Sequence, residues 1–151
     1  MKKVIYTAIF GNKDTLKDPL YRQPDCDYVC FTDNQEVKSS VWDIVLVEKK
    51  FEDPVRCARY YKVLPHLHLQ KYSISLWVDA NFLICSPLEE YFAILGEQAN
   101  ILGFQHDQGR NCIYDEAEAV IRINKDDPDI VREQMKKYTL EGFPKSFGLS
   151  T

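Results

Sequence analysis

The sequence predicts an α/β domain built on a mostly parallel sheet flanked by helices. Apolar, β-branched runs come early in the chain and alternate with amphipathic helical segments, the order typical of α/β folds. Several of these runs end directly in polar side chains, as strands of open α/β sheets do at their carboxyl ends. The length of 151 residues fits one domain, so we expect residues 1–151 to form a single domain.

Residues 3–10 predict the first strand and the centre of the sheet. The run is β-branched and almost entirely apolar, as in a strand that helices cover on both faces. Residues 11–14 then break it with turn chemistry. A second strand is expected at residues 28–32, where it ends at Asp33, and a third at residues 42–48.

The segment after the third strand predicts a helix that begins at Pro54 and ends near Leu64. Asp53 suits the N-cap, and proline suits the first helical position. Apolar residues recur at the i, i+3, i+4, i+7 spacing of one helix face. They are Cys57, Tyr60, Tyr61 and Leu64. Pro65 closes the helix.

The second half of the chain predicts a hairpin, a further strand and three helices. Residues 73–78 form an expected strand that runs into Asp79, and a second apolar run follows at residues 82–84. Ser86 and Pro87 predict the start of a helix, as N-cap and first helical residue. The remaining expected elements are a strand at 100–104 and helices at 114–124 and 128–141.

The composition argues against two classes of protein. Lys and Arg number 19 against 23 Asp and Glu, and the formal net charge of -4 argues against a general nucleic-acid binder. No apolar run reaches the length of a membrane span, and the apolar start after Lys3 reads as a strand, not a signal peptide. The five cysteines include no CxxC pair, so we expect reduced thiols and a cytoplasmic location.

Two groups of side chains are candidates for a metal site. Asp79 supplies a charge and Asn81 a neutral carbonyl oxygen, and two such oxygens one residue apart in a turn can face one hard cation and a diphosphate. The alternative is an Asx-type turn in which both side chains bond only local backbone. His66 and His68 share one face of an extended segment, but they need a third ligand, and packing at the helix end is the alternative.

Cationic and acidic side chains offer further candidates. Arg56, Arg59 and Lys62 lie three apart on the expected helix and suit a diphosphate or a carboxylate, with a solvated helix face as the alternative. Asp33 follows a strand, where it either accepts hydrogen bonds from a ribose or base or forms a turn.

Residues 105–116 form the densest polar cluster of the chain and follow an expected strand, as a site loop should. Arg110 is its cationic candidate. Asp115 and Glu116 are either first-turn acids that stabilise a helix N-terminus or general-base candidates.

Five blocks in their order along the chain resemble one family. The blocks are residues 6–12, 27–34, 56–66, 77–81 and 106–116. They look like the glycosyltransferase-like family, formerly a domain of unknown function, that occurs in bacteria and in plant Golgi proteins related to mucilage and pectin. The layout is similar to that of glycogenin-type and lipopolysaccharide-galactosyltransferase enzymes, and the resemblance covers almost the whole chain.

The resemblance implies a GT-A-like, Rossmann-type fold, a nucleotide-sugar donor such as a UDP-sugar, and a divalent cation, usually Mn²⁺. It implies a hexosyltransferase-like enzyme that transfers a sugar to the hydroxyl of a glycan or another acceptor. The residues expected to bind the nucleotide sugar are Thr7, Phe10, Gly11, Asn12, Asp33, Arg56, Arg59 and Lys62. The expected catalytic residues are Asp79, Glu116 and Arg110, and the expected metal ligands are Asp79 and Asn81.

The sequence departs from the family pattern in two places. Asn81 stands where the Asp-x-Asp motif has its last acid, and the lost charge should weaken metal binding. Members usually continue well beyond the point reached at Thr151, so we expect the C-terminal part to be lacking. Both departures favour an alternative, a non-catalytic domain that binds a nucleotide sugar or a glycan. A nucleotidyltransferase is a weaker alternative, because the loop at residues 11–13 lacks its Gly- and Lys-rich character.

Overall fold

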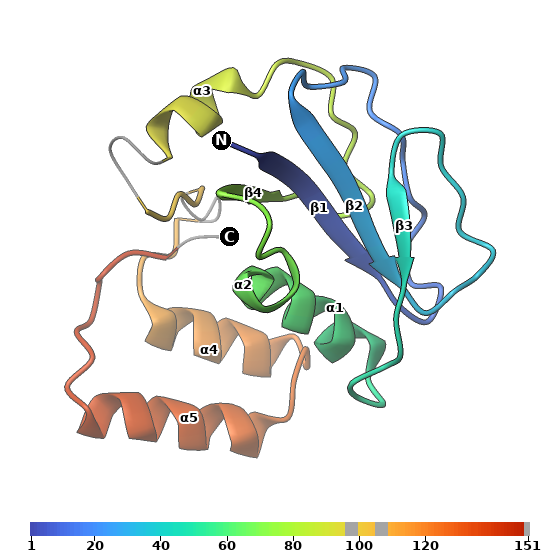
Figure 1. The fold of residues 1–151 in the computed structure, drawn as a ribbon. Coiled ribbons are helices and arrows are strands. Elements are labelled where there is room, and N and C mark those ends of the chain that lie inside the picture. Colours follow the sequence, from blue (N-terminus) through green and yellow to red (C-terminus); the bar gives the residue numbers. More distant parts are fainter. Residues whose placement is uncertain (96–99, 105–108, 150–151) are drawn as a thin grey trace. The chain divides into compact units, whose positions relative to one another are not determined.

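The chain divides into two compact units, Met1–Asn100 and Ile101–Thr151. The computed structural model in Figure 1 describes residues 1–95, 100–104 and 109–149. The first unit contains a sheet with flanking helices, and the second contains a pair of helices. Within these described ranges, no helix has both the length and the apolar character needed to cross a membrane.

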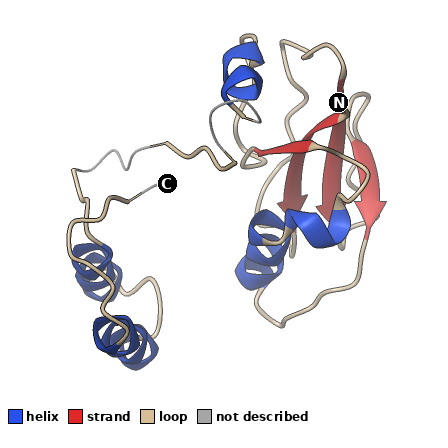
Figure 2. Cartoon of the chain, turned by 60° about the vertical axis from the view of Figure 1, so that its left-hand side comes forward, coloured by secondary structure: helices blue, strands red, loops and turns tan. Residues whose placement is uncertain are grey.

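Parallel strands form the sheet of the first unit in the order β3-β2-β1-β4. Their bounds are β1 Lys3–Ile9, β2 Cys26–Thr32, β3 Asp43–Leu46 and β4 Ile74–Trp77. The chain steps in one direction from β1 through β2 to β3, and it then returns to place β4 on the other side of β1. The predicted α/β class with a parallel sheet is confirmed, and Figure 2 shows the strands with helices beside them.

Strand β1 lies inside the sheet because both of its faces are buried. Its even-numbered residues, such as Tyr6, belong to one core cluster, and odd-numbered residues such as Ile5 belong to a second cluster. Successive side chains of a strand point to opposite faces, so a run that is apolar at both parities needs cover on both sides. The prediction of a central first strand is confirmed.

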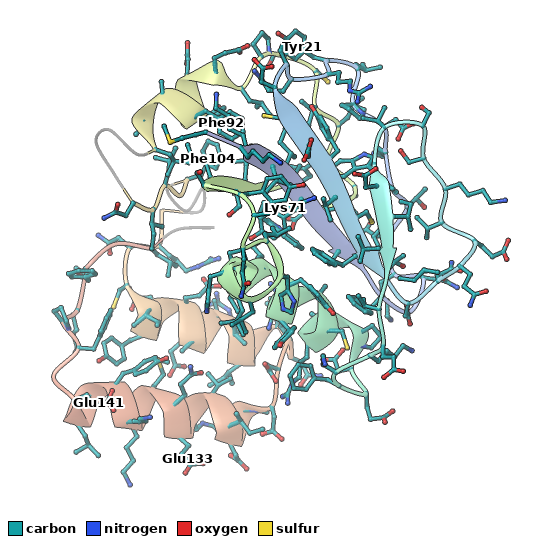
Figure 3. The ribbon with its side chains drawn as sticks, in the orientation of Figure 1. Tyr21, Lys71, Phe92, Phe104, Glu133 and Glu141 are labelled. Atoms are coloured by element: carbon teal, nitrogen blue, oxygen red, sulfur yellow. The ribbon has the colours of Figure 1, made fainter. Side chains whose placement is uncertain are left out.

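Helices from two parts of the chain cover these two faces. Helix α1, Pro54–Val63, places Cys57 and Tyr61 in the first cluster, and the short helix α2, Pro65–His68, follows it. The Tyr61 ring stacks on Phe31 and Phe10 at centroid distances of 4.6 and 5.6 Å. Such a pair adds about 0.5–1.5 kcal/mol beyond the area that it buries. Helix α3, Glu89–Ile94, places Phe92 in the second cluster, pointing toward the sheet in Figure 3.

The two helix starts in this unit have different origins. Asp53 caps α1 as predicted, and its carboxylate accepts a hydrogen bond from the Val55 amide at 2.9 Å. The predicted start of α3 at Ser86 and Pro87 is wrong, because the helix begins at Glu89. The cap acceptor comes from the distant Gln23, whose Oε1 accepts from the Leu88 amide at 2.8 Å while its Nε2 donates to Glu89 at 2.7 Å.

Two predicted strands are wrong. The apolar run at residues 82–84 does not pair with β4, and the Ile84 carbonyl instead accepts from the amides of Leu20 and Tyr21 at 2.9 and 3.1 Å. Residues 100–104 form no strand, and Leu102 is 40% exposed. An apolar run becomes a strand only where a neighbouring strand completes its backbone hydrogen bonds, and neither run has such a neighbour among the described residues.

The second unit contains a helical hairpin. Helix α4, Ile113–Arg122, and helix α5, Pro128–Leu140, run antiparallel in Figure 1 and bury small apolar side chains, among them Ala117 and Val131. Asp127 caps α5 through the amides of Asp129 and Ile130. Glu133 points away from α4 in Figure 3, as an exposed residue of the outer helix face does.

Candidate functional site

A cavity of about 210 Å³ opens at the carboxyl ends of β1 and β4. It is lined by Ala8, Ile9, Phe10, Lys13, Asp14, Pro54, Val55, Ala58, Trp77, Asp79, Ala80 and Asn81. In the order β3-β2-β1-β4, the strands β2 and β4 lie on opposite sides of β1, so the strand order reverses between β1 and β4. Ligands of open α/β sheets bind at such a topological switch point, so this cavity is the candidate site.

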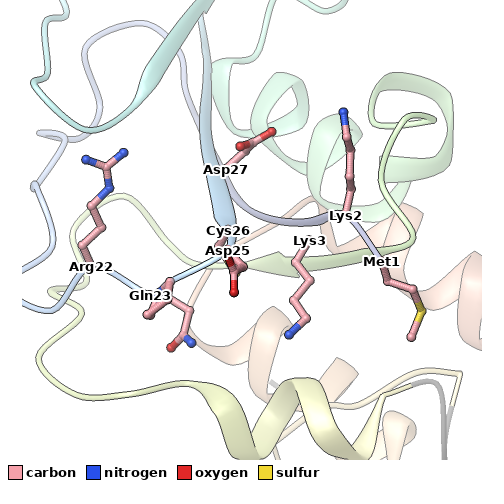
Figure 4. A pocket seen from close by; sticks show the side chains of 9 residues that line it. Met1, Lys2, Lys3, Arg22, Gln23, Asp25, Cys26 and Asp27 are labelled. Carbon is pink, nitrogen blue, oxygen red and sulfur yellow. The ribbon is translucent and has the colours of Figure 1, made fainter.

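A larger hollow of about 850 Å³ lies at the opposite ends of the strands, beside the amino ends of β1 and β2 (Figure 4). Its charges do not converge, because Lys2 and Lys3 point to opposite sides of the chain and Asp25 and Asp27 lie among them. The ammonium group of Lys3 lies 5.2 Å from the ring centroid of Phe92. A site needs convergent polar groups as well as volume, so the smaller cavity is the better candidate.

Asp79 lies in a turn, but its carboxylate reaches beyond that turn. The Phe82 amide donates to the Asp79 carbonyl at 2.9 Å and closes the turn. The Asp79 Oδ1 accepts a hydrogen bond from the Trp77 indole N–H at 2.7 Å and lies 3.7 Å from the Lys62 ammonium nitrogen. Among the described residues, the carboxylate therefore contacts side chains of β4 and α1, not the amides of its own turn.

One face of α1 is turned toward the cavity. Val55 and Ala58 line the cavity, and Lys62 continues their row at the i, i+3, i+7 spacing. Of the three predicted cationic residues of this helix, the structure therefore brings Lys62 to Asp79. Arg59 is exposed, and Arg56 lies 3.9 Å from Asp53 in the first turn.

Trp77 is one of the cavity-lining residues that the sequence analysis did not name. Its ring meets the Tyr6 ring edge to face at 5.3 Å, and the Lys62 ammonium lies 5.5 Å from its centroid. The Tyr6 hydroxyl donates to the Lys62 carbonyl at 2.9 Å, and burial raises the pKa of Tyr6 to about 12. The spacing of Trp77 and Asp79 could have indicated this contact, because residues two apart on a strand share a face and Trp77 is the last residue of the strand that precedes Asp79.

The carboxyl ends of β1 and β2 are joined by a second polar network. Gly11 has a φ of +59°, and its amide donates to Asp33 Oδ1 at 3.1 Å. The second Asp33 oxygen lies 3.2 Å from the Lys49 ammonium, and Asn12 Oδ1 accepts from Asn34 at 2.8 Å. Asp33 therefore fixes the turn that follows β1.

The residues of β1, β2 and their following turns that were predicted to bind the nucleotide sugar differ in their position relative to the cavity. Phe10 lines it, whereas Gly11, Asn12 and Asp33 lie beside it and do not line it. Thr7 is fully buried within β1, so its side chain is away from the cavity surface. The role of these residues in donor binding stays a prediction.

The other catalytic candidates belong to the second unit. Arg110 Nε donates to Glu116 Oε2 at 2.5 Å, and Glu116 lies in the first turn of α4. Residues 105–108 of the predicted polar cluster lie outside the described residues. The assignments of Arg110 and Glu116 as catalytic residues stay predictions.

Of the two histidines of α2, His68 packs against core rings, whereas His66 is exposed. His68 lies 4.6 Å from the Tyr61 ring centroid, and burial is the main cause that lowers its pKa. Within the described part of the chain, no three His, Cys, Asp or Glu side chains come together as a metal site would require. For His68, the structure therefore agrees with packing, which was the alternative to a metal site.

The fold is an open α/β domain, and its cavity is a candidate ligand site at the switch point, where nucleotide-binding domains of this architecture bind their ligands. The model of the family described as TOD1/MUCI70, glycosyltransferase-like domain, matches residues 1–150. The chain belongs to this family, as its motif blocks predicted. No curated protein and no solved structure matches the chain.

Proposed function

We propose that this glycosyltransferase-like domain binds the diphosphate of a nucleotide-sugar donor, such as a UDP-sugar, at the switch-point cavity. The observation that carries the proposal is the pairing of Asp79 with Lys62 beside that cavity. A carboxylate and an ammonium at one strand end offer both signs of charge to a ligand made of a diphosphate and its counter-ion.

The proposed reaction is sugar transfer to a hydroxyl of a glycan or another acceptor. The acceptor oxygen forms a bond to the anomeric carbon, the bond from that carbon to the diphosphate oxygen breaks, and the acceptor proton goes to a base. The Lys62 ammonium would stabilise the negative charge that develops on the departing diphosphate.

The residues beside the cavity suit a divalent cation only together with the donor. Asp79 and Asn81 supply one carboxylate and one amide oxygen, which are hard donors of the kind that Mg²⁺ and Mn²⁺ accept. A cation held by these two would take its remaining ligands from phosphate and water. When bound, the cation supplies Lewis-acid stabilisation of the diphosphate.

Calorimetry of UDP binding with and without Mn²⁺ tests this proposal on the wild type, Asp79→Ala and Asn81→Asp. We expect Mn²⁺ to strengthen UDP binding to the wild type, Asp79→Ala to abolish that assistance, and Asn81→Asp to increase it. Equal UDP affinity with and without metal in all three proteins would show that the triplet is only a turn. If UDP binds to none of them, the donor site itself is wrongly assigned.

A non-catalytic nucleotide-sugar- or glycan-binding domain is the second candidate function. Asn81 favours it, because a site with one carboxylate holds a cation weakly. Slow hydrolysis of UDP-sugars in the presence of Mn²⁺ distinguishes the two. Hydrolysis that Asp79→Ala removes supports the enzyme, and UDP-sugar binding without hydrolysis supports the binding domain. For either function we propose a reducing, cytoplasmic setting, in keeping with five free cysteines.

A further inference from the structure

We propose that Lys62 is a built-in counter-ion of Asp79 that competes with the divalent cation for the same carboxylate oxygen. In the free protein Lys62 occupies the position facing Asp79, and on donor binding it exchanges this carboxylate for the diphosphate. The exchange rests on the proposed function, whereas the competition for Asp79 does not require any nucleotide.

The first support is the geometry around a single oxygen atom. Asp79 Oδ1 accepts from the Trp77 indole at 2.7 Å, and the Lys62 nitrogen lies 3.7 Å from the same atom. The Trp77 ring lies under the Lys62 ammonium at 5.5 Å, so one aromatic side chain orients both partners. A cation that took this oxygen as a ligand would meet the positive charge of Lys62 at close range.

The second support is that this ion pair is easy to open. The Lys62 and Asp79 side chains are 40% and 50% exposed. Exposed ion pairs contribute little to stability, because water and salt screen them and long side chains lose entropy in forming them. The ion pair can therefore lower the affinity of Asp79 for a weakly bound cation and still open when the cation binds.

The third support is that the Lys62 side chain can also reach toward the cavity. It continues the row of Val55 and Ala58 that lines the cavity, so its long side chain extends from the helix face that borders the space proposed for the donor. A diphosphate there would attract the ammonium away from Asp79, since its two phosphate groups together carry more negative charge than one carboxylate. The same event would free Asp79 for the cation.

Mn²⁺ binding to the full chain in the absence of nucleotide tests the competition. Electron paramagnetic resonance of free Mn²⁺ gives the affinity for the wild type, Lys62→Met, Lys62→Arg and Lys71→Met. Lys71 is the matched control, because its ammonium also lies over an aromatic ring, that of Tyr72 at 4.9 Å, and it precedes the amino end of β4. Lys→Met changes the net charge equally at both positions and keeps the apolar stem.

We expect Lys62→Met to tighten Mn²⁺ binding about threefold to tenfold, the size of effect that one close charge near a protein surface supports. Lys62→Arg and Lys71→Met should stay within about twofold of the wild type. Asp79→Asn added to Lys62→Met should remove the gain. Unchanged Mn²⁺ affinity in Lys62→Met, equal gains in both Met variants, or a gain that survives Asp79→Asn would each overturn the competition.

UDP binding without metal tests the exchange separately. Lys62→Met should weaken it several-fold, and Lys71→Met should leave it within about twofold of the wild type. If Mn²⁺ binding responds as expected but UDP binds to no variant, the competition holds and the donor site fails. If UDP binds equally to Lys62→Met and to the wild type, Lys62 does not move to the diphosphate and the exchange is wrong. Circular dichroism and Trp fluorescence confirm that each variant is folded.

Discussion

Gly11→Ala should destabilise the first unit more than an ordinary glycine substitution. Gly11 has a φ of +59° and forms the turn that follows β1. An added Cβ would lie 2.7 Å from Cγ and 3.1 Å from Cβ of Pro54, the first residue of α1. The substitution therefore introduces a steric clash as well as backbone strain.

The expected loss is about 2–4 kcal/mol of unfolding free energy. A side chain in the left-handed region costs roughly 1–2 kcal/mol, and the reduced freedom of the unfolded chain returns about 0.4–1 kcal/mol. Overpacking a tight contact adds about 1–3 kcal/mol. The clash is the larger part, so most of the effect should depend on the Pro54 ring.

A double-mutant cycle with Pro54→Ala isolates this clash. Pro54→Ala deletes the Cγ atom at 2.7 Å and leaves only the looser 3.1 Å contact. Urea unfolding followed by Trp fluorescence reports on this unit, because both tryptophans, Trp42 and Trp77, lie in it. We expect the double variant to be about 1–2 kcal/mol more stable than the sum of the single changes, within the range measured for residues in contact. Additive effects would refute the steric argument and leave only the backbone strain.

Two further predictions concern stability. Because burial raises the pKa of Tyr6 to about 12, the folded state keeps a proton that the unfolded chain loses above about pH 10. This contribution to stability is complete below about pH 10 and falls by at most about 2.7 kcal/mol toward pH 12. In urea unfolding between pH 9 and 11, the free energy of unfolding should therefore decline less with pH for Tyr6→Phe than for the wild type. Gln23→Ala should cost about 1–3 kcal/mol, because it leaves the Leu88 amide and Glu89 without their partner, whereas Ala at the exposed Gln70 should cost less than about 0.5 kcal/mol; equal losses would contradict the capping role.

Local signals in the sequence were sufficient for the elements that depend on them. The first strand is apolar at both parities and is buried on both faces, and α1 begins where Asp53 and Pro54 place it. The run at residues 100–104 is also largely apolar, but it has no neighbouring strand in the part of the chain that the structure describes. Strand formation depends on a partner far away in sequence, which a local pattern does not contain.

The candidate site could be predicted only in part for the same reason. Asp79 was found because polar residues after a strand follow a general rule for parallel sheets. Which of three cationic residues reaches it depends on the rotation of α1 against the sheet, and this rotation is fixed by the packing of Cys57 and Tyr61. Trp77 was not among the predicted site residues, because an aromatic side chain in a strand gives no local sign that it contacts a site rather than the core.

Because Gln23 supplies the cap of α3, this helix can form its capped N-terminus only after the segment that carries Gln23 has folded against it. Gln23 and Leu88 are 65 residues apart, so the helix gains its N-terminal acceptor only after a large loop has closed. Helix α1 carries its own cap in the adjacent residue and can begin from local contacts alone. A peptide of residues 86–95 should therefore be unstructured in water, and α3 should become protected from hydrogen exchange only together with β2, where Tyr28 holds the Gln23 backbone at 2.8 Å.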